Sequence, residues 1–424
     1  MRMKFALSVQ IAMLGYASIA MAQTDSLKLS DALQNTLKYS PVLQQFPYEL
    51  RLNEANRLQA GLSPNPEIGV ALENVAGTGS STGVSNAELT LSLSQLIEMG
   101  DKRAYRLEKT DAQQQLSRDQ FELSRLDTLA ATTRSYILLV ELQQRADLLK
   151  TQQQREQRLL DIARQRAAAS TLTDADLTRL ELKLSRTALE QKANANAQQL
   201  ARAELAANWA KQPDFARVAG TLDALPLLPG LAELQTSLQR STQLKLFVSQ
   251  QRLLETELAL AQAESVVDWK VSGGVRRIEA LNDNALVLGF SIPWQLQDTG
   301  AAKRLSAQTQ LELNALQQQQ SQTRLNLLVE RIYLELDQLK EVSQVLKQQI
   351  IPQTTTLQQQ AERAYQQGQA DLFSLLTAEQ ELRQAQADLV SAQSRFHLQL
   401  LELERLTGQA LTLSGPVRLA TGDN

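Results

Sequence analysis

The sequence predicts a mainly α-helical protein with a small β part, in which one arrangement of strands and helices occurs twice. Residues 134–152 align over residues 331–349, and this alignment places Tyr136 over Tyr333. It also superimposes the predicted strands and helix breaks of the two halves. Internal similarity of this kind indicates a tandem duplication.

A change of period inside residues 87–110 predicts the unit that is repeated. Apolar and polar residues alternate up to Ser94, which is typical of a strand with two different faces. After Gly100 the chain contains helix formers and no further Gly or Pro before Pro213. A short amphipathic strand is therefore expected to lead into a very long helix.

The chain begins with an apparent export signal. Arg2 and Lys4 precede an apolar stretch that closes on Ala20-Met21-Ala22, so we expect residues 1–22 to be a signal peptide. No later apolar run reaches the length of a spanning helix, and an exported chain of this kind would enter a bilayer only as strands. A soluble periplasmic protein is the alternative.

The mature chain divides into two repeats. Residues 23–210 are expected to contain a leading helix, two strands, a long helix and a return helix. The Pro-rich residues 211–230 are expected to link them to the second repeat, residues 231–407, and residues 408–424 are expected to form a C-terminal tail.

Four segments have the alternation and the length of about ten residues that a tilted membrane strand needs. Leu89, Leu91 and Leu93 share one face of such a strand, whereas its other face is polar and suits a wet lumen. Trp269 and Trp294 suit the aromatic girdles at the lipid interface. Two hairpins that cover a soluble helical body are the alternative. The four segments are residues 66–75, 87–97, 266–277 and 285–296.

Four strands are too few to close a membrane barrel, and open sheet edges are not tolerated in lipid. Several copies of the chain would have to share one barrel. The number of strands in each copy by itself allows either a dimer or a trimer.

Each long helix contains apolar residues at coiled-coil spacing. A helix of about 65 residues rises roughly 100 Å, so it must cross an aqueous space. In the first helix we expect the seam to contain Leu126, Ala130, Thr133, Ile137 and Val140. In the second we expect Leu325, Leu328, Ile332, Leu339, Val342 and Leu346, with Glu335 as a polar exception and Val329 and Leu336 beside the stripe.

Composition excludes several functions. The formal net charge is only −3, which offers no basic surface for nucleic acid. His397 is the only histidine and there is no cysteine, so a Cys/His metal site and a His-based triad are excluded. Met99 is the only methionine after the signal peptide. We therefore predict no catalytic, cofactor or metal site and no enzyme.

Helix breaks at residues 168–173 and 367–370 are predicted to form two tips at one end of the helices. Thr173 with Asp176 resembles a capping box, and Asp371 stands where a carboxylate favours the start of a helix. These residues therefore have a structural role as caps besides any role in function.

The chain resembles the TolC family of outer-membrane efflux channels over essentially its whole mature length. The duplicated order of elements and the break Tyr365-Gln366-Gln367-Gly368 carry this resemblance. SPNPEIGVALENV, followed by LSLSQLIEMGDKR, is similar to the CzcC-like channels of heavy-metal efflux systems. The resemblance implies a homotrimer whose strands form a twelve-stranded β-barrel in outer-membrane lipid, continued by a long periplasmic α-helical barrel.

The resemblance also implies roles for particular residues. Gly100 and Gly300 would mark the two junctions between barrel and helices. The tips would close the tunnel at rest and meet the adaptor, with candidate residues Thr173, Asp174, Asp176, Tyr365, Gln367, Gly368, Ala370, Asp371, Ser374 and Thr377.

The tip departs from the family pattern in its charges. Ser374 and Thr377 occupy positions where TolC-like drug channels carry lumen-facing aspartates, and Ala370 occupies the position of a latching arginine. The acidic rings and the latch are therefore not expected in the same form here.

The predicted function is that of the outer-membrane channel of a tripartite, RND-type efflux system in a Gram-negative bacterium. Such a channel is a passive exit duct for substrates handed over by an inner-membrane pump and a periplasmic adaptor (membrane fusion protein), here divalent heavy-metal cations. The alternatives are a TolC-like channel for drug efflux or type I protein secretion, a periplasmic coiled-coil adaptor and a soluble helical scaffold.

Overall fold

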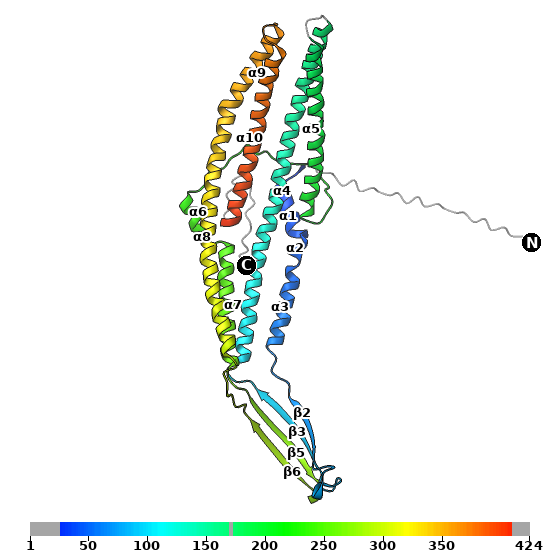
Figure 1. Ribbon diagram of the computed structural model, residues 1–424, viewed down its shortest axis with the longest axis vertical. Helices are drawn as coiled ribbons and strands as arrows, with labels where there is room; N and C mark the ends of the chain where they lie inside the picture. The colour runs from blue at the N-terminus through cyan, green and yellow to red at the C-terminus, as the bar shows by residue number, and fades with distance from the viewer. Residues whose placement is uncertain (1–25, 169–172, 409–424) are drawn as a thin grey trace, which may run out of the picture.

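The computed structural model describes residues 26–168 and 173–408. The chain is strongly elongated, with a sheet at one end and two helical hairpin tips at the other (Figure 1). The predicted signal peptide, residues 169–172 of the first tip and residues 409–424 of the predicted tail lie outside the described residues.

The first half of the chain begins with short helices that lead to a strand hairpin. A single long helix and an antiparallel return helix follow. Its elements are β1 (Ser26–Leu27), α1 (Leu29–Tyr39), α2 (Pro41–Gln44), α3 (Phe46–Ala60), β2 (Glu67–Glu73), β3 (Glu88–Ile97), α4 (Lys102–Ala168) and α5 (Asp174–Ala207).

The second half repeats this order after a connecting segment. Its elements are β4 (Arg217–Val218), α6 (Leu231–Leu238), α7 (Thr242–Glu264), β5 (Trp269–Ile278), β6 (Asp283–Ser291), α8 (Ala301–Val345), a π-helical turn η3 (Leu346–Ile350), α9 (Ile351–Gln366) and α10 (Leu372–Thr407).

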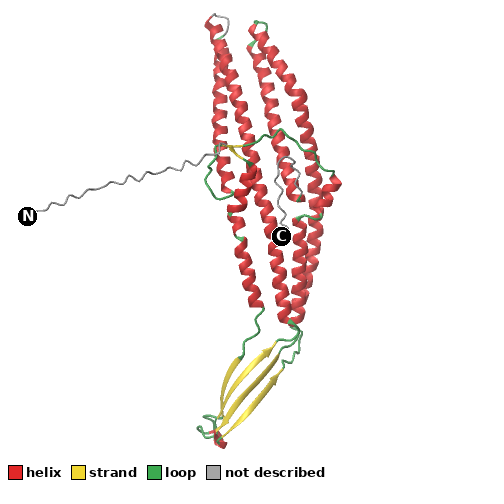
Figure 2. Ribbon diagram, turned by 180° about the vertical axis from the view of Figure 1, so that it is seen from behind, coloured by secondary structure: helices red, strands yellow, loops and turns green. Residues whose placement is uncertain are grey.

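The four predicted strands pair in one antiparallel sheet of order β2-β3-β5-β6 (Figure 2). Each half contributes one hairpin, and β3 pairs with β5 where the halves meet. The last strand is shorter than expected because it ends at Ser291, before Pro293, which has no N–H for a strand ladder. Trp294 therefore lies in the connection to α8 rather than in a strand.

The buried seams of the long helices differ from the expected stripes. In α8 the buried residues follow a regular alternation of four and three, and Val329 and Leu336 belong to this seam. Val342 is 38% exposed instead, because its neighbour Ser343 takes the seam position. The α8 and η3 seam contains Leu325, Val329, Ile332, Leu336, Leu339, Ser343 and Leu346.

Helix α4 buries two adjacent stripes rather than one. Ala130, Ile137 and Val140 are buried as expected, whereas Leu126 and Thr133 are only half-buried. The second stripe contacts the N-terminal elements and the connecting segment, which the sequence pattern does not locate. It contains Leu129, Thr132, Tyr136, Leu139 and Gln143.

A π-helical turn interrupts the long helix of the second half. It spans Leu346–Ile350 and ends two residues before Pro352. Proline lacks an N–H and its ring clashes with the carbonyl four residues earlier, so a wider turn relieves the helix at this point. The first long helix has no proline and is continuous over α4.

Residues 211–230, expected to be a linker, also have a structural role. Strand β4 pairs in parallel with β1 at the start of the described chain. The hydroxyl oxygen of Tyr136 lies within hydrogen-bond distance of two carbonyl oxygens, Ala219 O at 2.6 Å and Leu27 O at 3.0 Å. Burial raises the pKa of Tyr136 to about 12. Tyr136 thus holds both segments against the middle of α4.

Candidate functional site

One face of the four-stranded sheet is apolar and exposed. Val70, Leu91, Val275 and Leu286 lie side by side across the four strands. Their exposed fractions are 69, 56, 53 and 74%. A continuous apolar face of this kind has no partner within the described chain, which fits contact with lipid.

The opposite face of the sheet consists of small and charged groups. At its centre Ser92 pairs with Gly69 on one side and with Gly274 on the other. Toward the helices, Lys270 Nζ lies 2.6 Å from Glu67 Oε2. The alternation predicted from the sequence is therefore confirmed.

Only one of the two girdle candidates belongs to a strand. Trp269 begins β5, and its ring packs edge-on against Phe290 with centroids 5.7 Å apart. Trp294 is 87% exposed beyond the end of β6. The two tryptophans do not contact each other.

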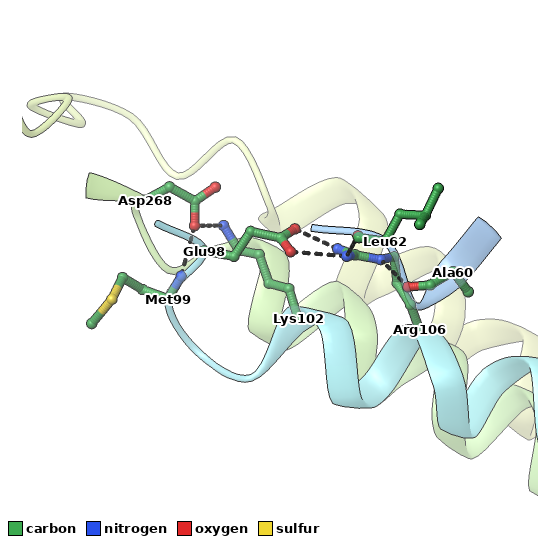
Figure 3. A network of polar contacts seen from close by, with 7 residues as sticks. All are labelled: Ala60, Leu62, Glu98, Met99, Lys102, Arg106 and Asp268. Carbon is green, nitrogen blue, oxygen red and sulfur yellow. Dashed lines mark hydrogen bonds and ion pairs between the residues drawn. The ribbon is translucent and has the colours of Figure 1, made fainter. Parts of the chain in front are cut away.

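At the first junction between sheet and helices, a buried lysine binds an aspartate from the other half of the chain (Figure 3). Lys102 Nζ lies 2.7 Å from Asp268 Oδ1, which also accepts a hydrogen bond from Met99 N at 2.9 Å. Lys102 is only 8% exposed. This contact joins the start of α4 to the residue before β5.

Arg106 forms the second contact of this junction (Figure 3). Its guanidinium binds both oxygens of Glu98, at 2.5 and 2.9 Å, and donates to the carbonyls of Ala60 and Leu62. Hydrogen bonding by Arg106 lowers the pKa of Glu98 and so favours its ionised form. Arg106 therefore holds three segments together at the junction of sheet and helices: the start of α4, the end of α3 and the residue after β3.

The two predicted junction glycines differ in conformation. Gly100 has φ +74°, and a Cβ there would come within 2.9 Å of Val266 Cβ. Gly300 has φ −88° and precedes α8 as its cap. Beside it, Asp298 accepts from Gly300 N at 3.0 Å and pairs with Arg304. Only the first junction requires glycine for its backbone.

The acidic residues at the tips cap helices. Thr173 Oγ1 accepts from Asp176 N at 3.2 Å and donates to Asp176 Oδ2 at 2.7 Å, which begins α5. Asp371 Oδ1 accepts from Ser374 N at 2.9 Å and begins α10. Hydrogen bonding by Ser374 lowers the pKa of Asp371. Asp174 is exposed in the first turn of α5.

The other tip candidates form the turn between α9 and α10. Gln367 caps α9, Gly368 has φ +73°, and Ala370 N donates to Ala364 O at 3.2 Å. Ser374 is exposed, whereas the next residue, Leu375, is buried. Thr377, one turn later, is also exposed.

Arg166 links the two tips and was not found by sequence reasoning. Its guanidinium lies 4.6 Å from the ring centroid of buried Tyr365 and donates to Gln366 O at 2.7 Å. The two hairpins also share an apolar cluster that includes Leu160 and Leu375. The structure thus brings the two predicted breaks together at one end of the molecule (Figure 1).

Sequence reasoning also missed the junction residues Glu98, Lys102, Arg106 and Asp268. Charges of both signs around Gly100 were a visible signal for a local ion pair. The partner of Lys102, however, lies 166 residues away, and only the fold identifies it.

Within the described residues, we find no cluster of three carboxylate, imidazole or thiol groups that could hold a metal ion. No helix in this part of the chain is long and apolar enough to span a membrane. His397 is packed: its Nε2 lies 3.1 Å from Leu222 O, and burial lowers its pKa.

Comparison with known proteins finds relatives in sequence and in fold. The chain is 27% identical over 368 residues to the cobalt-zinc-cadmium resistance protein CzcC of Cupriavidus metallidurans, with 85% of each chain covered. It superposes on the outer membrane protein VceC of Vibrio cholerae with a TM-score of 0.74, at 18% identity, over 91% of this chain and 97% of VceC. The chain therefore has the fold of this outer-membrane protein. No family model matches it.

The shared fold extends over nearly the whole chain. The outer-membrane channel OprN superposes with a TM-score of 0.75 at 16% identity, and 90% of each chain is covered. The proteins on which the chain superposes are outer-membrane proteins and channels.

Proposed function

We propose that this protein is the outer-membrane exit duct of a tripartite efflux system and acts as a homotrimer. The observation that carries the proposal is the sheet with one exposed apolar face and one polar face, joined to helices that extend far beyond a bilayer. The edges of β2 and β6 have no partner within the described chain, so strands of neighbouring copies would complete the barrel.

Divalent heavy-metal cations are the proposed cargo. The similarity to a cobalt-zinc-cadmium resistance protein over 85% of the chain supports this choice. The protein would not coordinate the cargo tightly but provide a wet path with small and polar walls, as the polar face of the sheet does. An inner-membrane RND pump and a periplasmic adaptor would supply energy and select the cargo.

Deletion of the gene in its host tests the cargo. Cells that lack the protein should accumulate more cobalt, zinc or cadmium, measured as metal content per cell, and the wild-type gene should restore the lower level. Complementation with Leu91→Arg, which should not insert into the membrane, is the matched negative control. Unchanged metal content together with new sensitivity to drugs would instead favour the drug-efflux alternative.

The tips are the proposed gate and adaptor contact. Ser374 and Thr377 provide exposed neutral groups there, and the carboxylates of Asp176 and Asp371 are engaged in capping. Ser374→Asp would add a ring of three charges to a trimer and should increase cation selectivity in planar bilayers. An unchanged selectivity would place the constriction elsewhere.

A further inference from the structure

The polar face of the sheet ends in a charged cluster at the end away from the helices. Glu73 is the last residue of β2, Glu88 is the first residue of β3, and Arg276 lies near the end of β5. The register places Glu73 beside Glu88 and Arg276 beside Thr90. All four side chains belong to the polar face and lie next to the loops that connect the strands.

Arg276 holds this cluster together. Its Nη1 lies 2.8 Å from Glu88 Oε2, its Nη2 lies 3.2 Å from Glu73 Oε2, and its Nε donates to Thr90 Oγ1 at 3.0 Å. One guanidinium therefore contacts two neighbouring strands from a third. The arginine is fixed in place rather than free to extend into solvent, since three directed contacts restrict its rotamers.

The cluster has an excess of negative charge. Two carboxylates against one guanidinium leave a net charge of −1 in each copy of the chain. The next layer toward the helices consists of Gly69, Ser92 and Gly274, which carry no charge. Moving along the polar face, an ion thus meets a small-walled, neutral zone and then a charged zone.

We propose that Glu73, Glu88 and Arg276 form a charge filter at the outer end of the lumen, which favours small cations over anions during exit. The filter rests on the proposed function, because only a trimeric channel turns these clusters into a ring of three. It is separate from the helical tips, which lie at the opposite end of the molecule (Figure 1). Rings of fixed charge near a pore mouth set the local ion concentration and hence selectivity.

Reversal potentials in planar bilayers under a KCl gradient test the filter. Arg276→Gln should raise the ratio of potassium to chloride permeability by about twofold, because two carboxylates then remain without their cation. The double variant Glu73→Gln with Glu88→Gln should lower the ratio below that of the wild type. Arg276→Lys keeps the charge and should retain the wild-type ratio.

Arg277→Gln is the matched control. Arg277 is adjacent in the chain and loses the same charge, but it lies on the apolar face, paired in register with Leu89, so the permeability ratio should not change. Equal ratios for the wild type, Arg276→Gln and the double carboxylate variant would overturn the filter.

The channel function and the charge filter are contradicted by different results. If the wild-type protein forms no conducting pore, the proposed channel function is contradicted. If it conducts but Arg276→Gln and Arg277→Gln shift the ratio equally, the channel stands and the filter is overturned. Should Arg276→Gln fail to insert, the double carboxylate variant and Arg276→Lys decide the question by the same measurement.

Discussion

Gly100 is the residue on which the first junction depends. Its φ of +74° is unfavourable for a residue with a Cβ, and that Cβ would lie 2.9 Å from Val266 Cβ. Gly100→Ala should therefore cost about 1–2 kcal/mol or more. Gly300→Ala is the control for the backbone conformation, since Gly300 has an ordinary φ, while its added Cβ would also be crowded, at 2.7 Å from Arg304 Nη1 and 3.0 Å from Ser265 Cβ. Thermal unfolding in detergent should separate the two variants, and equal midpoints would contradict a special role for Gly100.

Tyr136 gives a second test at the scale of one residue. Tyr136→Phe removes the hydroxyl that binds Leu27 O and Ala219 O. Leu27 O still accepts from Ala219 N at 2.8 Å, but Ala219 O loses this partner, which should cost about 1–3 kcal/mol. Tyr333, its counterpart in the repeat, makes no side-chain hydrogen bond within the described residues, and Tyr333→Phe should be nearly neutral. The measurement is denaturant or thermal unfolding. A similar loss in both variants would show that the ring, rather than the hydroxyl, matters.

At the scale of the element, the strand faces make a sharp prediction. Leu91 is 56% exposed on the apolar face, and its neighbour Ser92 lies on the polar face beside Gly69 and Gly274. Leu91→Arg should cost about 2–4 kcal/mol near the bilayer midplane, whereas Ser92→Arg would meet water and should be milder. The yield of each variant inserted into the outer membrane measures this difference. Equal yields for the two variants would contradict the assigned strand faces.

The elements also show why sequence patterns were only partly sufficient. The strand positions were predicted because a period of two needs only local information. The α8 seam was misread at Val342 because several apolar residues lie close to the stripe, and the fold buries Ser343 instead. The π-helical turn was not predicted, although Pro352 stands in the sequence. A proline indicates that a helix is disturbed, but it does not indicate whether the helix ends, kinks or widens into a π-helical turn.

At the scale of the whole molecule, the sheet predicts the oligomer. A four-stranded sheet with two free edges and an apolar face should associate until the edges are paired, and three copies would give twelve strands. Mass measurement in detergent should return three times the mass of the mature chain. A stable monomer in lipid would contradict this architecture, and a dimer would require a smaller barrel.

The sequence by itself determined which segments are strands and helices, that the unit occurs twice, and that one face of the sheet is apolar. These properties follow from local periodicity and self-similarity, which need no knowledge of distant contacts. Only the tertiary structure decided that Lys102 binds Asp268, that Arg166 bridges the tips and that Arg276 gathers two carboxylates from other strands. Such partners are brought together by packing and register, so their separation along the chain conceals them from any pattern in the sequence.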